Sequence, residues 1–367
     1  MPEQPTLAAL EDALAHVEDP ELHRPLMQLG MLKNLRVEGT TARMRVVLTT
    51  PACPLKDRIE QEIRAAVVGV VPGIEAVQLE WDANVSRTRG APGRREIEGV
   101  RNIVAVSAGK GGVGKTTVAV NLALALQRTG ARVGLLDTDI YGPNVPIMLG
   151  LRDRPESLDG RIVPLQASGL KVMSIGTIID PDKPVVWRGP MLANALQQFL
   201  FEVAWGELDY LICDLPPGTG DIQLSLAQTI PLTGALIVTT PQDVSIADVT
   251  KGIAMFTQLR VPILGVIENM SGFVCSHCGE RTDIFSRGGG RILAEERSLP
   301  FLGEIPLDPR IRTGGGDGQP LVAATPDAPE AAVFQRVAAL LAAQISQANF
   351  RTQAGPVMPS GPRLPVR

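Results

Sequence analysis

The chain has 367 residues, enough for about two domains, and a net charge of −4, which provides no overall basic surface for nucleic acid or an anionic membrane. Its apolar runs fall short of the ~20 residues that a membrane span requires, and its N-terminus lacks the basic-then-apolar pattern of a secretory signal. Because 4 cysteines in this length do not make a disulfide framework, we expect a cytoplasmic protein. The charge and the short apolar runs lead us to expect neither nucleic acid nor a membrane as a partner.

Residues 1–85 are predicted to form a small α+β domain. Leucine and alanine recur at helical spacing in residues 7–19, and apolar residues do so again in residues 55–70. Residues 41–50 alternate apolar and polar side chains as a half-buried strand does, and residues 74–81 are also typical of a strand. The helices and strands together indicate a compact unit that precedes a different kind of sequence.

A linker and a larger domain are predicted to follow. Residues 86–99 are basic, contain Gly and Pro and have no apolar period. Over residues 100–349, short runs rich in Val, Ile and Leu alternate with helix-length segments, which predicts an α/β domain with a mostly parallel sheet and helices on both faces. The Pro-rich tail, 350–367, is expected to be disordered. The expected strands are residues 103–107, 131–137, 208–214, 234–240 and 262–268.

A phosphate-binding loop is the clearest motif. Gly109, Gly114, Lys115 and Thr116 match G-x-x-x-x-G-K-[ST] between a predicted strand and a predicted helix over 116–130. In such loops backbone N–H groups bind phosphates at a helix N-terminus, the lysine pairs with the β and γ phosphates and the hydroxyl binds Mg²⁺. A glycine-rich turn without a ligand is the alternative. The predicted ATP-binding residues of the loop are Gly109, Lys110, Gly111, Gly112, Val113, Gly114, Lys115, Thr116 and Thr117.

Aspartates follow two further predicted strands. Asp137 and Asp139 lie at the end of one strand, and Asp214 ends the next. In parallel sheets ligands bind beyond the carboxyl ends of the strands, so these carboxylates are expected near the loop. Asp214 stands where a Walker B aspartate would hold the Mg²⁺ shell, and we predict Mg²⁺ ligation by Thr116 and Asp214. Singly, each aspartate could instead be a helix cap or turn former.

Lys110 is a second lysine in the loop, and within one subunit it is redundant with Lys115. The segment KGGVGKT resembles the deviant Walker A of the MinD/ParA/nitrogenase-iron-protein class of P-loop ATPases. The resemblance implies that Lys110 crosses the interface of a homodimer and acts at the partner's nucleotide. It also implies that Asp139 positions the attacking water. The predicted catalytic residues are therefore Lys110 and Asp139, and a solvated loop lysine is the alternative for Lys110.

Several longer segments indicate one family within this class of ATPases. They are AGKGGVGKTTVAVNLA, LLDTDIYGPNVP, VWRGPM, DYLICDLPPGTGD, IENMSGFVC and GEIPLDPRIR. Over about residues 100–345 they resemble the Mrp/ApbC family of iron–sulfur cluster carrier ATPases. The segment LTTPACPLKDRIEQEI resembles the small domain that other iron–sulfur assembly factors share. The resemblance also implies that Asn269 lies against the adenine, with residues 306–309 as the other wall; an Asn amide can pair with adenine.

Cys275 and Cys278 form a C-x-x-C pair between glycines. Two thiolates do not saturate a 4Fe-4S cluster or a structural zinc site, each of which takes four ligands. Taken alone the pair could be a redox dithiol, half a zinc site or half a cluster site. If the chain dimerises, two pairs on the twofold axis supply four thiolates. The resemblance implies a bridging cluster there, and bridging zinc is the rival.

The other cysteines and two histidines carry weaker signals. Cys213 lies inside an apolar strand and is expected to be a small buried hydrophobe. Cys53 precedes a predicted helix, whose dipole could lower the pKa of the thiol, so reactive and structural roles both remain open. His16 and His23 have no partners at metal-ligand spacing.

The function expected from these features is that of a homodimeric ATPase that carries an iron–sulfur cluster, of the 4Fe-4S type, and passes it to apo iron–sulfur proteins. Cluster-assembly scaffolds are expected as further partners. The alternative is a MinD/ParA-like positioning ATPase with a bridging structural zinc. That alternative lacks support, because the tail has no amphipathic period and the chain no strong basic surface. A nitrogenase-type reductase would draw its cluster cysteines from two distant segments.

Overall fold

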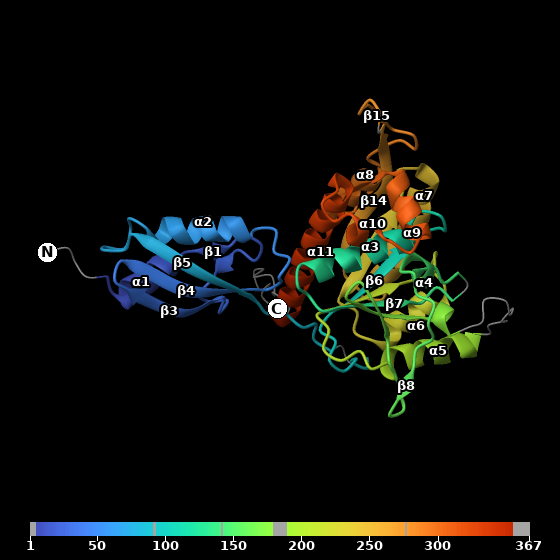
Figure 1. The fold of residues 1–367 in the computed structure, drawn as a ribbon, viewed down its shortest axis with the longest axis horizontal. Helices are drawn as coiled ribbons and strands as arrows, with labels where there is room; N and C mark the ends of the chain where they lie inside the picture. Colours follow the sequence, from blue (N-terminus) through green and yellow to red (C-terminus); the bar gives the residue numbers. More distant parts are fainter. Residues whose placement is uncertain (1–4, 91–92, 141, 179–188, 276, 355–367) are drawn as a thin grey trace, which may run out of the picture.

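A small N-terminal domain lies beside a larger α/β domain in the computed structural model of the chain (Figure 1). Residues 350–354 of the predicted tail belong to the last helix instead. The rest of the tail and residues 186–188 of the VWRGPM segment lie outside the described residues. The structure describes residues 5–90, 93–140, 142–178, 189–275 and 277–354.

The N-terminal domain packs two helices and a three-stranded sheet around one core. On β4 every second residue, Ala42 to Leu48, is buried, which confirms the predicted alternation. β3 pairs antiparallel with β4, and β5 pairs parallel with it. The first helix ends earlier than expected, since residues 18–19 form β1 with β2, Arg24–Pro25. The elements are α1 (Leu7–Leu14), β1 (Glu18–Asp19), β3 (Leu32–Glu38), β4 (Thr41–Leu48), α2 (Lys56–Val67) and β5 (Ala76–Ala83).

The larger domain is built on one sheet, whose strand order is β10-β11-β7-β12-β6-β13-β14-β15 with β16 paired to β14. The pairs from β11 to β14, and β14–β16, are parallel, while β10–β11 and β14–β15 are antiparallel edges. The strands are β6 (Ile103–Ala108), β7 (Val133–Asp137), β10 (Leu165–Ala167), β11 (Leu170–Ser174), β12 (Tyr210–Asp214), β13 (Gly234–Thr239), β14 (Ile263–Val274), β15 (Arg281–Thr282) and β16 (Phe301–Leu307).

Helices cover both faces of this sheet, as predicted. Along β12, Tyr210 and Ile212 pack into one hydrophobic core, and Leu211 and Cys213 pack into the other. α3, α9, α10 and α11 contribute to the first core, and α5 to α8 contribute to the second. The helices are α3 (Lys115–Arg128), α4 (Val145–Met148), α5 (Gly189–Phe201), α6 (Asp221–Thr229), α7 (Asp243–Gln258), α8 (Gly289–Glu296), α9 (Pro309–Gly316), α10 (Leu321–Ala324) and α11 (Pro329–Ala354).

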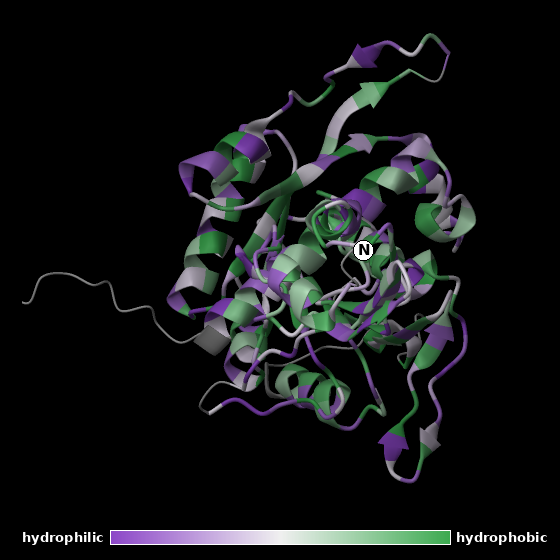
Figure 2. Ribbon diagram, turned by 90° about the vertical axis from the view of Figure 1, so that its left-hand side faces the viewer, coloured by the Kyte–Doolittle hydropathy of each residue, from purple (hydrophilic) through white to green (hydrophobic). Residues whose placement is uncertain are grey.

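Two hairpins project from the body of the larger domain in Figure 2, at the top and at the bottom of the view. The lower one joins β8 (Ser157–Leu158) to β9 (Arg161–Ile162). The upper one is the continuation of β14 beyond the sheet edge, paired with β15. The sequence predicted a strand over 262–268 only, so the extra residues of β14 carry the chain outward to this tip.

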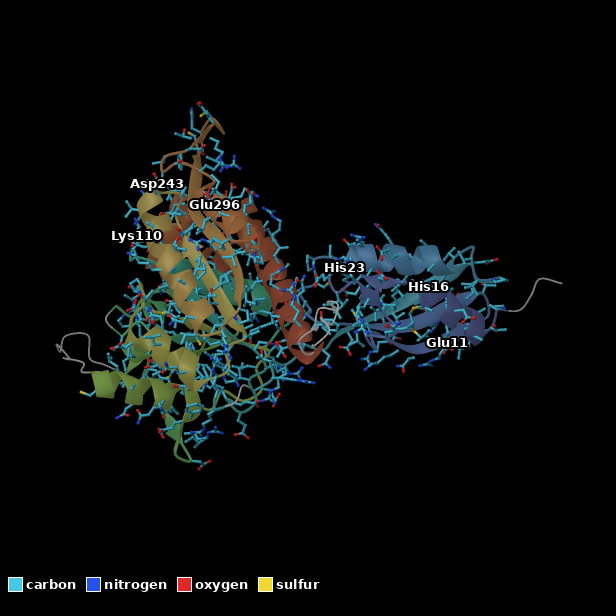
Figure 3. The ribbon with its side chains drawn as sticks, turned by 180° about the vertical axis from the view of Figure 1, so that it is seen from behind. Glu11, His16, His23, Lys110, Asp243 and Glu296 are labelled. Atoms are coloured by element: carbon cyan, nitrogen blue, oxygen red, sulfur yellow. The ribbon has the colours of Figure 1, made fainter. Side chains whose placement is uncertain are left out.

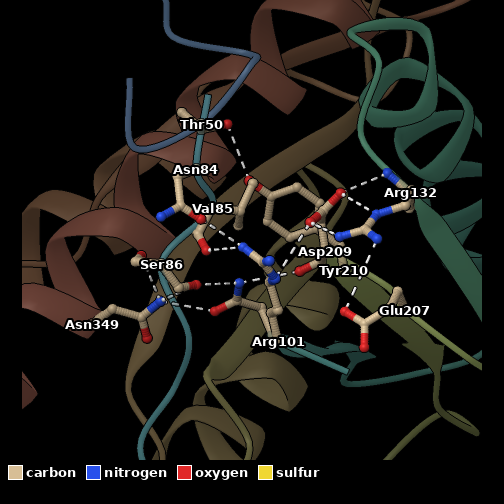
Figure 4. Close-up of polar contacts among 11 residues, drawn as sticks. Thr50, Asn84, Val85, Ser86, Arg101, Arg132, Glu207, Asp209, Tyr210 and Asn349 are labelled. Carbon is tan, nitrogen blue, oxygen red and sulfur yellow. Dashed lines mark hydrogen bonds and ion pairs between the residues drawn. The ribbon is translucent and has the colours of Figure 1, made fainter. Parts of the chain in front are cut away.

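The two domains meet at the β12 end that begins with Tyr210. The hydroxyls of Thr50 and Tyr210 lie 3.0 Å apart in a hydrogen bond, and both residues are fully buried (Figure 4). Ala52, two residues after Thr50, packs into the core of the larger domain. The loop before α2 is therefore an anchoring contact between the domains.

The start of the segment predicted to be a linker, and the two residues before it, are also held by the larger domain. Arg101 donates to the Asn84 side chain at 2.8 Å and to the Val85 carbonyl at 2.9 Å (Figure 4). The Asn349 amide of α11 donates to the carbonyl and the hydroxyl of Ser86 at 3.1 and 2.9 Å. Residues 86–90 form no helix or strand. Their first residue, Ser86, is nevertheless hydrogen-bonded to the larger domain.

The Thr50–Tyr210 hydrogen bond is expected to couple the domains by about 1 kcal/mol, since both hydroxyls are shielded from water. Tyr210→Phe, Thr50→Val and the double variant form a double-mutant cycle, measured as the free energy of unfolding of the full chain in urea. Thr49→Val, at the preceding residue, is the control. A coupling energy of zero would show that this contact does not hold the domains together.

Candidate functional site

The phosphate-binding motif connects β6 to α3, as predicted. Gly109 is required by close packing, since a Cβ there would collide with the backbone of Asp248 and Val249 in α7. Gly114 caps α3 at φ +78°, and a Cβ there would collide with the amide of Asn269. The loop therefore folds tightly at the N-terminus of a helix, a geometry that suits an anion.

A buried ion pair lies at the base of the loop. Lys115 Nζ is 2.6 Å from Asp214 Oδ1, and the Thr116 hydroxyl donates to Asp214 Oδ2 at 2.7 Å. Burial raises the pKa of the Asp214 carboxyl, and the neighbouring Lys115 opposes that rise. The structure thus brings together the three residues predicted to bind phosphate and Mg²⁺. A hydroxyl beside a carboxylate is a fitting pair of Mg²⁺ ligands.

The end of β7 is fastened to the end of β12. Thr138 donates through its N–H and its hydroxyl to the Asp214 carbonyl, at 3.0 and 2.8 Å. Asp137 is buried and accepts from the Ser174 hydroxyl at 2.9 Å and from the Asp139 N–H at 3.0 Å. Burial, with Asp214 adding to it, raises the pKa of Asp137 to about 7. These bonds leave the Asp139 side chain half-buried at the cleft.

A cleft of about 750 Å³ opens above the loop. Asp139 and Lys110 both line it, together with Asn144 and Met148 of the α4 region. Lys110 Nζ lies 3.4 Å from the Gln242 side chain, just before α7. In Figure 3 Lys110 and Asp243 lie on the same side of the domain. The rest of the wall comes from Gly142, Leu192 and residues 216–217 and 220–223.

A second cavity, of about 310 Å³, adjoins the cleft and shares Gly114, Thr117, Asn144 and Met148 with it. Asn269 lines it, and its Nδ2 donates to the Val113 carbonyl at 2.8 Å. The amide is therefore fixed by the loop, with its oxygen not used in that bond. Opposite lie Pro306, Leu307 and Asp308, the predicted second wall.

The cysteine pair lies at the tip of the β14–β15 hairpin. The Gly279 N–H donates to the Cys275 carbonyl, and the Cys275 N–H donates to the Glu280 carbonyl, each at 2.9 Å. The backbone N–H groups of Cys278 and His277 hold the pKa of the Cys275 thiol below its usual value. No group of three or more His, Cys, Asp or Glu side chains able to hold a metal occurs in the described part of the chain.

The other two cysteines and the two histidines lie in different surroundings. Cys213 is fully buried in β12, as predicted, and burial raises the pKa of its thiol. For Cys53, whose role the sequence left open, burial, aided by Glu21 and Asp19, raises the pKa to about 11 against a hydrogen bond from the Leu55 N–H, which favours the structural role. His16 and His23 lie on the N-terminal domain, away from Lys110 (Figure 3).

Several residues of the cleft wall were not predicted from the sequence, among them Asn144, Met148 and Gln223. Met148 ends a helix of four residues, which is too short to show a period, and Asn144 directly precedes that helix. Gln223 lies in the first turn of α6, where a glutamine gives no motif. Each reaches the cleft through tertiary packing alone.

No helix among the described residues is long and apolar enough to cross a membrane.

Comparisons with known families match both domains. Residues 99–342 match the family described as NUBPL iron-transfer P-loop NTPase, and residues 7–81 match the one described as iron-sulfur cluster assembly protein. The chain also resembles a solved structure, a nucleotide-binding protein of Archaeoglobus fulgidus in complex with ADP. The TM-score is 0.54 at 39% identity, over 60% of this chain and 88% of that one.

Full-length relatives agree with these matches. An iron-sulfur cluster carrier protein of Deinococcus radiodurans is 51% identical over 340 residues, 92% of this chain and 95% of that protein. One from Synechocystis is 46% identical over 349 residues, 94% of this chain and 99% of that protein. The expected resemblance is confirmed, and the chain belongs to the iron–sulfur cluster carrier family of P-loop NTPases.

Proposed function

We propose that this P-loop NTPase works as a homodimer that hydrolyses ATP with Mg²⁺ and carries a 4Fe-4S cluster to apo iron–sulfur proteins. The observation that carries the proposal is the hairpin: Cys275 and Cys278 stand at a projecting tip with no third ligand among the described residues. Four thiolates are needed for such a cluster, and a second copy of the hairpin supplies the missing two.

ATP would occupy the cleft and the adjoining cavity. Lys115 would exchange Asp214 for the β and γ phosphates, and the freed carboxylate would join Thr116 around Mg²⁺. The adenine would lie in the smaller cavity, where the free oxygen of the Asn269 amide can accept from its exocyclic amine. Two observations support this placement of ATP: the cleft is larger than the adjoining cavity, at about 750 against 310 Å³, and the two share Gly114 and Thr117 of the loop.

The N-terminal domain supports a role in cluster assembly rather than in positioning on membrane or DNA. It matches an iron-sulfur cluster assembly family, which a positioning ATPase does not explain. Its anchoring through Thr50 and Ala52 keeps it on the same body as the hairpin. Recipient apoproteins, and scaffolds that load the carrier, are the partners that this pair of domains would serve.

Reconstitution with iron and sulfide without oxygen is expected to give about four iron per dimer, because one shared site has four thiolates. Iron, sulfide and the visible spectrum measure it. Cys275→Ala and Cys278→Ala should each abolish binding, while Cys53→Ala, with its thiol half-buried elsewhere, should retain it. Zinc that resists replacement by iron, or a cluster unaffected by Cys275→Ala, would refute the carrier proposal.

Lys115→Gln is expected to weaken ATP binding by roughly 100-fold, because a charge-assisted contact to phosphate is lost while a donor remains beside Asp214. Isothermal titration with ATP and Mg²⁺ measures this loss. The same variant should load a cluster as the parent does but fail to transfer it to an apoprotein. A variant that transfers normally would mean that transfer does not depend on ATP.

Lys110 is expected to complete the site of the opposite subunit. Lys110→Ala and Asp139→Ala should each hydrolyse ATP poorly alone, whereas an equal mixture should recover activity, because one site per mixed dimer is then intact. The ATPase rate is followed against mixing ratio, with subunit exchange verified by mass spectrometry. If exchange occurs without recovery, Lys110 acts within its own subunit.

A further inference from the structure

Gln223 is a buried polar side chain that the proposed nucleotide contacts do not use. It lies in the first turn of α6, is 1% exposed and forms part of the cleft wall. Glutamine is mostly found exposed, so its burial here calls for polar partners. Its Nε2 supplies them, because it donates to the Pro216 carbonyl at 2.7 Å and to the Gly218 carbonyl at 3.2 Å.

These two bonds fix the loop that joins β12 to α6. Gly218 takes φ +91°, and its N–H donates to the Ala108 carbonyl at 2.9 Å, one residue before the phosphate-binding motif. Gly218 is thus held by Ala108 through its N–H and by Gln223 through its carbonyl. Since the loop begins directly after Asp214, its position is set next to the proposed Mg²⁺ ligand.

The oxygen of the Gln223 side-chain amide is a hydrogen-bond acceptor without a donor in the described part of the chain. Oε1 of Gln223 is buried and has no hydrogen-bond partner among the described residues. It lies 3.5 Å from the position that a Cβ on Gly220 would take, and Gly220 also lines the cleft. An unpartnered buried acceptor is unfavourable, so this orientation of the amide is maintained by the two hydrogen bonds that its Nε2 donates.

We propose that Gln223 is a positioning residue for ATP hydrolysis. Its two N–H groups hold the loop 215–220 in place at the cleft. The inference rests on the proposed ATP hydrolysis. Because the phosphates and the adenine would contact other elements, loss of Gln223 should lower kcat and leave nucleotide affinity nearly unchanged.

The test uses the full chain with Gln223→Leu, which has similar volume and no polar atoms, and Gln223→Glu, which accepts but donates to neither carbonyl. Gln228→Leu is the matched control, because Gln228 is an exposed glutamine of the same helix. For each variant, kcat and KM for ATP and the Kd for ADP are measured. ADP binding also reports that the variant is folded.

Both Gln223 variants are expected to lose roughly tenfold to 100-fold in kcat, because a misplaced loop costs rate. KM and the Kd for ADP should stay within about twofold of the control. A kcat equal to that of Gln228→Leu, or a parallel loss of kcat and ADP binding, overturns the inference. An active Gln223→Glu overturns the loop-holding role. If the parent protein does not hydrolyse ATP, the proposed function itself fails, and this inference fails with it.

Discussion

The ion pair between Lys115 and Asp214 is the contact on which the site depends. Both side chains are buried, at 6% and 0% exposure, so each would be strongly disfavoured without the other. In the proposed complex, ATP and Mg²⁺ would offer each partner a replacement for the charge that it loses: phosphate for the lysine and a cation for the aspartate. Binding would then exchange one set of charge contacts for another and create no unpaired buried charge.

β14 links this site to the cysteine hairpin. Asn269 and Cys275 are six positions apart on one continuous stretch of chain, where Met270 and Gly272 have positive φ. Glu268, fully buried, accepts from the Ser271 hydroxyl at 2.6 Å and from the Gly290 N–H at 2.7 Å, which fixes the strand against α8. The candidate adenine contact and the cysteine pair are therefore joined by one short, irregular segment of β14.

Apolar runs and the glycine-rich motif predicted the central strands of the sheet and the P-loop residues that line the cleft. Val-, Ile- and Leu-rich runs located β6, β7, β12 and β13, because strands buried on both faces have to be apolar throughout. The strands β3, β11 and β16 were not predicted, since they mix polar and apolar residues and depend on their neighbours. Cys53 shows the same limit: its position before a helix suggested a low pKa, whereas burial by distant residues raises it.

The anchoring of the N-terminal domain is compatible with a dimeric cluster carrier because of where it lies on β12. Tyr210, which bonds to Thr50, begins that strand, and Asp214 ends it, so the two contacts lie about 13 Å apart along the strand. The nucleotide cleft is at the carboxyl ends of the strands, and the N-terminal domain is at the opposite ends. A second subunit could therefore approach Lys110 and the hairpin from the cleft side without displacing the domain that already occupies the other end of the sheet.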